Sequence, residues 1–304
     1  MKQNILKIVV CLKVIRQLSA DRGFDIVTRT VNTESLVKMI NPEDEYALEM
    51  ALLLKEGIEE RIGHAEIIAV SVSPAEDEAV LRRYLAMGVD QAFRIWDEGF
   101  DTLNAQAVAF LLSECIRRIE PDLILCGKKA LDVNGNETGG YLSEFLNIPQ
   151  VSGVTSADIS QKERALICRR QVEKLGWELV ETSLPIVLTV ELGENEPRYP
   201  DLFSILAWLG KEIKILDKVS LKIDANRLDE LNSTVRFLDW NRPRPEKILT
   251  PKGELPPEER MRLVVSGGMD KKKTEFIEGE AKEVASQMVN LLVRKKILKA
   301  HGDV

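Results

Sequence analysis

The chain has 304 residues, of which 44% are hydrophobic, so it can bury the core of one large domain or of two small ones. Its 42 basic and 49 acidic residues leave a formal net charge of −7, which argues against a nucleic-acid-binding protein. The sequence shows no secretory leader pattern and no run of the ~20 apolar residues that a membrane-spanning helix needs. We therefore expect a cytoplasmic protein without a membrane span.

The cysteines and histidines form no catalytic or metal-binding pattern. The four cysteines stand singly in apolar surroundings, without C-x-x-C spacing: Cys11, Cys115, Cys126 and Cys168. The two histidines, His64 and His301, lie far apart and have no cysteine or acidic neighbour that forms a motif. We expect reduced, buried cysteines and neither a zinc or iron–sulfur site nor a histidine-based nucleophilic site.

In the first half of the chain, apolar runs typical of strands buried on both faces alternate with helical patterns. The predicted strands are residues 5–14, 66–72, 91–96 and 123–126. The predicted helices begin at Asn41-Pro42, near Pro74 (ending at Gly88), near Asp101 and after Asn136. This alternation predicts a mostly parallel sheet with helices on both faces, in which ligands bind at the carboxyl ends of the strands.

After Pro149 the pattern changes to β segments at residues 151–159, 165–172 and 177–191, which we expect to be antiparallel additions to the sheet. A polar segment at 193–200 precedes a short apolar helix at 202–209. Five prolines among charges predict an extended linker at 241–259, and an amphipathic helix follows Glu280. We therefore predict an α/β domain at residues 1–215 and a C-terminal arm at 216–304. The helix of this arm needs a surface to pack on, either its own domain or, as we expect, a partner subunit.

The loop after the 123–126 strand is the most informative segment. Its potential ligand-binding groups are two amides, a hydroxyl and three glycines: Asn134, Asn136, Thr138, Gly127, Gly139 and Gly140. Free backbone N–H groups and the dipole at the start of the next helix attract a phosphate, and glycines let the backbone approach it closely. These physical arguments alone leave a binding loop and a structural, asparagine-capped turn equally open. The loop is neither a Walker loop nor a G-x-G-x-x-G fingerprint.

The motif Gly-Lys-x-Ala-x-Asp-x-x-x-Asn-x-Thr-Gly, at residues 127–139, resembles the nucleotide loop of the electron-transfer flavoprotein β subunits, the family that includes FixA. Three more segments are similar to that family in the same order. Residues 39–45 resemble its Asn-Pro helix start, 86–90 its Ala-Met-Gly-Ala-Asp segment, and 195–199 its Asn-Glu-Pro-Arg-Tyr signature. The resemblance runs from about Ile5 to Lys211.

The resemblance implies an α/β fold like that of the adenine nucleotide alpha hydrolases, an α subunit that carries the redox-active FAD, and a structural AMP in this chain. The AMP contacts it implies are Cys11, Asn41, Pro42, Glu43, Asp44, Val72, Gly127, Lys128, Lys129, Ala130, Leu131, Asp132, Val133, Asn134, Gly135, Asn136, Glu137 and Thr138. It also implies docking of an acyl-CoA dehydrogenase through Glu194, Asn195, Glu196, Pro197, Arg198 and Tyr199, and a quinone oxidoreductase as electron acceptor.

The chain departs from the family pattern at several positions. Residues 132–139 read Asp-Val-Asn-Gly-Asn-Glu-Thr-Gly in place of Asp-Asp-Asp-Cys-Asn-Gln-Thr-Gly, which changes how ribose and phosphate are held. Glu194 stands where relatives present an apolar anchor to the dehydrogenase, and a charge there carries a desolvation cost. Leu18 stands where relatives have a tyrosine near the flavin. The stretch beyond Lys211 is longer than usual in the family.

No residue of the chain is a convincing acid, base or nucleophile, so we expect an electron-carrier subunit rather than an enzyme. One alternative is the β subunit of a flavin-bifurcating relative, in which a second FAD replaces AMP. Asn136 and Thr138 favour AMP, because those relatives tend to carry Ala and Val at the matching positions of an Asp-Gly-Asp-Thr-Ala-Gln-Val-Gly loop. Another is a free-standing nucleotide-binding regulatory protein of the universal stress type, which the Asn-Glu-Pro-Arg-Tyr motif disfavours.

Overall fold

The computed structural model describes residues 5–17, 24–25, 30–31, 36–61, 63–160, 164–172, 176–193, 195–235, 256–258, 260–261, 279 and 281–294. The chain divides into two units, Met1–Arg242 and Pro243–Val304.

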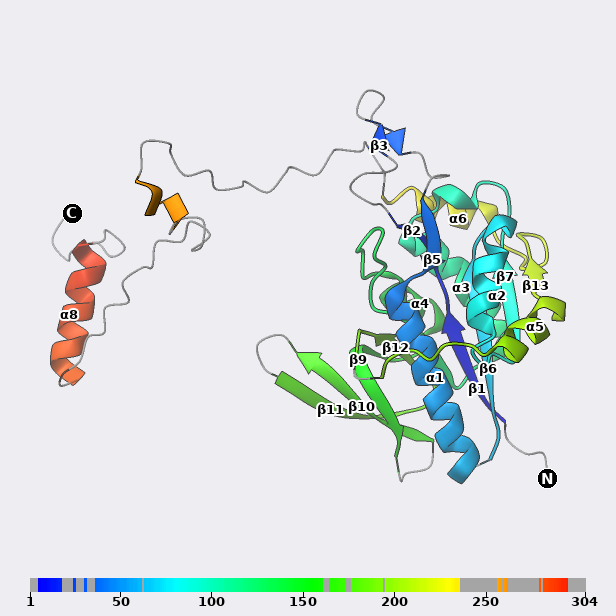
Figure 1. Cartoon of the computed structure of the whole chain (residues 1–304), viewed down its shortest axis with the longest axis horizontal. Helices are drawn as coiled ribbons and strands as arrows, with labels where there is room; N and C mark the ends of the chain where they lie inside the picture. Colours follow the sequence, from blue (N-terminus) through cyan, green and yellow to red (C-terminus); the bar gives the residue numbers. More distant parts are fainter. Residues whose placement is uncertain are drawn as a thin grey trace. The chain divides into compact units, whose positions relative to one another are not determined.

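A nine-stranded sheet forms the centre of the first unit, in the order β11-β10-β9-β12-β8-β1-β6-β7-β13 (Figure 1). Its strands are β1 (Leu6–Cys11), β6 (Ala65–Val72), β7 (Gln91–Ile95), β8 (Leu123–Gly127), β9 (Gln150–Ile159), β10 (Ala165–Val172), β11 (Gly176–Ser183), β12 (Ile186–Val190) and β13 (Lys214–Leu216). All neighbours from β9 through β12 to β13 are parallel, while β10 runs antiparallel to β9 and β11. The predicted mostly parallel sheet with antiparallel strands is confirmed.

The first strand is shorter than predicted. The expected run over residues 5–14 ends at Cys11, and Val14 begins β2 (Val14–Gln17), which pairs antiparallel with β5 (Val37–Ile40) in a separate two-stranded sheet. The strand ends because the chain turns at Lys13, whose backbone N–H donates to the Asp44 side chain at 2.8 Å. A second small sheet pairs β3 (Phe24–Asp25) with β4 (Thr30–Val31).

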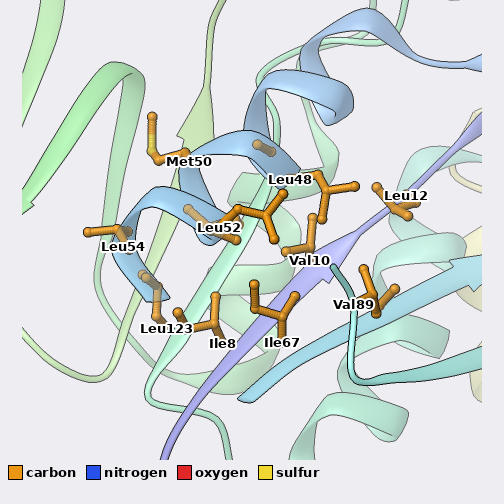
Figure 2. Packing of buried hydrophobic residues seen from close by; sticks show 14 of the residues in the cluster. Ile8, Val10, Leu12, Leu48, Met50, Leu52, Leu54, Ile67, Val89 and Leu123 are labelled. Atoms are coloured by element: carbon orange, nitrogen blue, oxygen red, sulfur yellow. The ribbon is translucent and has the colours of Figure 1, made fainter. Parts of the chain in front are cut away.

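Helices cover both faces of the sheet, and the alternation of side chains along each strand supplies both cores. Ile8 and Val10 of β1 pack on the side of α1 (Pro42–Arg61) and α2 (Glu78–Leu85). Val9 and Cys11 pack on the side of α3 (Ala105–Ile119) and α4 (Thr138–Leu146). Figure 2 shows Leu48 of α1 above the strands. The remaining helices of this unit are α5 (Leu202–Gly210) and α6 (Ala225–Asn232).

The predicted bounds of two helices need correction. The second helix begins as a 3-10 turn at Ala75–Asp77 and ends at Leu85, three residues before Gly88, which adopts a positive φ of 138° in the turn that follows. The predicted start near Asp101 is a separate 3-10 turn, Phe100–Thr102, and α3 begins after Asn104. The Asn104 side chain caps α3 by accepting the N–H of Ala107 at 2.9 Å.

The predicted β segment at 177–191 consists of two strands of different kinds. Leu184-Pro185 separates β11, an exposed antiparallel edge strand, from β12, which is fully buried. We expected antiparallel additions throughout this region. This is wrong for β12, which lies parallel between β8 and β9, and for β9, which is parallel to β12 and antiparallel only to β10. The continuous apolar sequence of Ile186–Val190 is what an interior parallel strand requires.

The first unit continues beyond the predicted α/β region: β13 pairs in parallel with β7, and α6 packs against α3. In the second unit, the predicted helix after Glu280 is confirmed as α8 (Ala281–Arg294). Of the linker predicted at 241–259, only residues 256–258 are described. Among the described helices, none combines the length and apolar character that crossing a bilayer requires.

Asn104 connects the start of α3 to the end of α6, and its hydrogen bonds give a stability prediction. Its amide nitrogen donates to the carbonyls of Leu231 and Asn232 at the end of α6 at 2.9 and 3.0 Å, while its oxygen caps α3. Asn104→Ala should lower the free energy of unfolding by ~1–3 kcal/mol, because it removes the cap and leaves carbonyls without a donor. Asn104→Asp keeps the cap alone and should have an intermediate stability in urea unfolding. Equal stability of Asn104→Ala and the wild type would contradict this role.

Candidate nucleotide-binding site

The carboxyl ends of adjacent parallel strands meet at one edge of the sheet, where the predicted nucleotide contacts begin. Cys11 ends β1, Val72 ends β6 and Gly127 ends β8, and β1 lies between the other two strands. The segment from Gly127 to Thr138, here called the nucleotide loop, connects β8 to α4. Val72 pairs with Ile95 of β7, on the side of β6 that faces away from β8.

The start of α1 binds the nucleotide loop through side chains. Asn41, which is 2% exposed, donates from its amide nitrogen to the carbonyl of Lys129 at 2.9 Å and accepts the N–H of Leu131 at 3.0 Å. Glu43 accepts the N–H of Lys129 at 2.6 Å. The sequence predicted that the segments at residues 41–44 and 127–138 would lie together, and the structure brings them into direct contact.

Asp44 links the ends of two neighbouring strands. Its carboxylate accepts the N–H of Gly127 at 2.7 Å and that of Lys13 at 2.8 Å. Burial raises the pKa of Asp44 to about 7, against the opposing effect of these two N–H donors. A Cβ atom at residue 127 would collide with the Asp44 carboxylate, so this position requires glycine.

The cysteines behave as expected. All four are free and buried. Burial raises the pKa of the Cys11 thiol, and nearby Cys126 and Asp44 raise it further. Cys11 therefore contributes an uncharged, apolar surface at the end of β1.

Two charged residues of the nucleotide loop pair with protein groups. The ammonium of Lys128, for which an AMP contact was expected, lies 2.9 Å from Glu191, the residue that follows β12. Asp132 lies 2.8 Å from the ammonium of Lys13 and also accepts the N–H of Val133. Residues 131–137 are exposed.

The beginning of α4 offers free N–H groups to an anion. Glu137 occupies the cap position, but its side chain makes no capping hydrogen bond, so the first N–H groups of the helix from Thr138 onward lack a side-chain acceptor. Gly139 packs against β12, where a Cβ would collide with the methyl group of Thr189. Asn134 and Asn136 adopt left-handed conformations, with φ of 52° and 53°, and shape the approach to this helix. The arrangement suits a phosphate at the helix start.

The second predicted site, the partner-docking segment, contacts α1 farther along the helix. Glu49, only 4% exposed, accepts from Nη2 of Arg198 at 2.7 Å and from its Nε and backbone N–H at 3.0 Å. Glu56 accepts from Nη1 at 2.6 Å. The hydrogen bonds to both carboxylates raise the pKa of Arg198. Arg198 therefore anchors this segment from inside, while the following Tyr199 is 88% exposed.

Glu196, Pro197 and Pro200 line a surface pocket of about 290 Å³ together with residues of α1 and α2. Asn195 is partly buried, and Glu194 lies outside the described residues. The sequence reasoning missed Glu49, Glu56 and Glu191, the carboxylates that hold Arg198 and Lys128. Only Glu49 could have been found from the sequence, because it is an acidic residue on the apolar, core-facing side of the helix predicted after Asn41-Pro42. The sequence gives no comparable signal for Glu56 or Glu191.

The geometry defines the class of protein as an α/β protein with a glycine-bearing loop at the carboxyl edge of a mostly parallel sheet. The family model described as "Electron transfer flavoprotein domain" matches residues 28–217. The chain therefore belongs to the electron transfer flavoprotein family, with relatives named as its β subunits.

Three relatives illustrate the similarity. The chain is 33% identical to the electron transfer flavoprotein subunit beta of Thermoanaerobacterium thermosaccharolyticum over 243 residues, covering 80% of this chain and 90% of the relative. It is 31% identical to the subunit beta of Bacillus subtilis, covering 91% and 94%. It is also 31% identical to the protein FixA of Azotobacter vinelandii, covering 87% and 90%. This family membership disfavours the universal stress alternative.

The pKa of Asp44 gives a pH-dependent prediction. Because the folded-state pKa is raised, the native chain keeps a proton between about pH 4 and 7 that the unfolded chain has lost. The free energy of unfolding therefore falls as pH rises through this window and levels off above it. Asp44→Asn removes this contribution, so its Tm should fall less than that of the wild type between about pH 5 and 7. Thermal unfolding of both nucleotide-free proteins tests this, and parallel Tm curves would disprove it.

Proposed function

We propose that this chain is the β subunit of a heterodimeric electron carrier and pairs with an α subunit that holds the redox-active FAD. In this proposal, the chain binds AMP structurally and acts in the cytoplasm without a catalytic residue of its own. FAD supplies the redox chemistry when bound, and this chain supplies a folded surface that brings a donor within reach. The donor is an acyl-CoA dehydrogenase or another flavin dehydrogenase, and the acceptor a quinone oxidoreductase.

The observation that carries the nucleotide assignment is the way α1 fixes the nucleotide loop. Asn41, Glu43 and Asp44 use four hydrogen bonds to hold residues 127–131, and this leaves the uncapped start of α4 as the place for a phosphate. Cys11 and Val72 then border the site from β1 and β6. The exposed loop residues from Asp132 to Glu137 supply the polar groups for a ribose.

The nucleotide is identified by its release from the purified complex. We expect one AMP and one FAD per heterodimer after denaturation and chromatography. Gly139→Val should lower the AMP content severalfold, because the added side chain collides with Thr189 and displaces the start of α4. Gly210→Val, at a helical glycine of α5 with no atom within 4 Å of the added Cβ, is the matched control for a glycine substitution in a helix. Two FAD and no AMP would instead identify a flavin-bifurcating β subunit.

We further propose that residues 195–199 dock the electron-donating dehydrogenase, with Arg198 as the internal anchor. Glu49→Gln retains the size of the side chain but loses the charge that holds the Arg198 guanidinium. It should raise the KM for the dehydrogenase by about tenfold, equivalent to ~1.4 kcal/mol, and leave the FAD and AMP contents unchanged. Glu56→Gln, whose carboxylate is 52% exposed, is the matched control and should change the KM far less.

Electron transfer measured against dehydrogenase concentration provides the readout. An equal KM for Glu49→Gln and the wild type would refute docking through this segment. A loss of bound AMP in Glu49→Gln would show instead that the effect spreads to the nucleotide site through α1.

A further inference from the structure

One face of α5 is apolar and exposed. Leu202 is 65% exposed, Phe203 82%, Leu206 55% and Leu209 62%, whereas Trp208 on the opposite face is 3% exposed. The spacing of the three leucines places them along one line of the helix. An exposed apolar face of this kind marks a contact with another apolar surface.

The fold holds α5 firmly, so its exposure belongs to the folded state. The Asp201 side chain caps the helix by accepting the N–H groups of Phe203 and Ser204 at 2.8 and 3.0 Å. At the other end, Arg82 of α2 donates to the carbonyls of Trp208 and Lys211. The helix therefore presents its apolar face as a preformed surface.

The chain runs from α5 into β13, the edge strand of the sheet (Figure 1), and this part of the sequence is rich in lysine. Residues 202–222 contain four lysines, Lys211, Lys214, Lys218 and Lys222, against two acidic residues, in a chain whose net charge is −7. Three of these lysines donate to uncharged oxygens, namely the Asp90 carbonyl, the Gln91 amide and the Glu98 carbonyl. Within the described part of the chain, none of the four forms a salt bridge, and Lys211, Lys214 and Lys218 lie over aromatic rings.

We propose that α5 and these four lysines form a docking surface for an anionic lipid bilayer, with α5 lying in the plane of the interface. The leucines and Phe203 would enter the boundary between headgroups and acyl chains, and the lysines would contact anionic headgroups. The composition favours lipid over protein, because protein interfaces are depleted in lysine and enriched in arginine and aromatic residues. Protein–protein interfaces also contain direct hydrogen bonds between the two partners, whereas the exposed face of α5 offers no polar side chain.

Vesicle sedimentation tests this surface. The full-length protein, purified with its flavin-carrying subunit, is mixed with vesicles of phosphatidylcholine alone or with one third phosphatidylglycerol. It should pellet with the phosphatidylglycerol vesicles and not with phosphatidylcholine alone, and added salt should weaken the association. AMP and FAD contents of the same preparation are measured in parallel, so a failure of the proposed function is detected separately.

Variants separate the apolar and the electrostatic contributions. Phe203→Ser with Leu206→Ser should reduce vesicle binding at least tenfold, and Lys211→Gln with Lys214→Gln should weaken it by roughly fivefold per lysine. Val235→Ser removes an apolar side chain that is 62% exposed outside this surface and should bind like the wild type. Because all these positions are exposed, the variants should retain the Tm of the wild type.

Two results would overturn the proposal. The first is a wild-type complex that fails to bind phosphatidylglycerol vesicles. The second is equal binding by the wild type and the Phe203→Ser, Leu206→Ser double variant. If the complex ignores vesicles but this double variant loses electron transfer from the dehydrogenase, the surface belongs to a protein partner instead.

Discussion

The carboxylates of α1 hold together segments that lie far apart in the chain. Asp44 joins the ends of β1 and β8, Glu43 binds the nucleotide loop, and Glu49 binds Arg198, which is 149 residues away. A buried carboxylate is costly unless donors compensate it, and each of these three accepts at least one backbone N–H. The cost of leaving them unpaired therefore favours one arrangement of the sheet edge. A single helix thus positions both the proposed nucleotide site and the proposed docking segment.

The sequence predicts the elements whose periodicity is strong and local. The buried strands β1, β6 and β8 and helix α1 follow from apolar runs and from an Asn-Pro start. The turn at Lys13 cannot be predicted from local periodicity, because it depends on a side-chain acceptor 31 residues away. The position of β12 cannot be predicted in this way either, because strand order is a property of the whole sheet. With three residues, β13 is too short to show a period.

The candidate site shows the same division between local and distant information. The glycine-bearing loop and the segment at residues 41–44 are recognisable in the sequence, and the structure places them in contact. The partners of individual charges are not recognisable, because they depend on long-range folding. The family motif implies that Lys128 contacts AMP, yet in the structure its ammonium pairs with Glu191. That ion pair connects the nucleotide loop to the start of the segment that carries Arg198.

The position of β12 also constrains the order in which the protein can fold during synthesis. β8 and β9 precede β12 in the chain, yet β12 lies between them and pairs with both. The two halves of the sheet therefore stay separate until residue 190 has left the ribosome. Until then, β8 and β9 each lack the strand that pairs with them, so their unpaired backbone groups and apolar side chains are the features on which a chaperone would act.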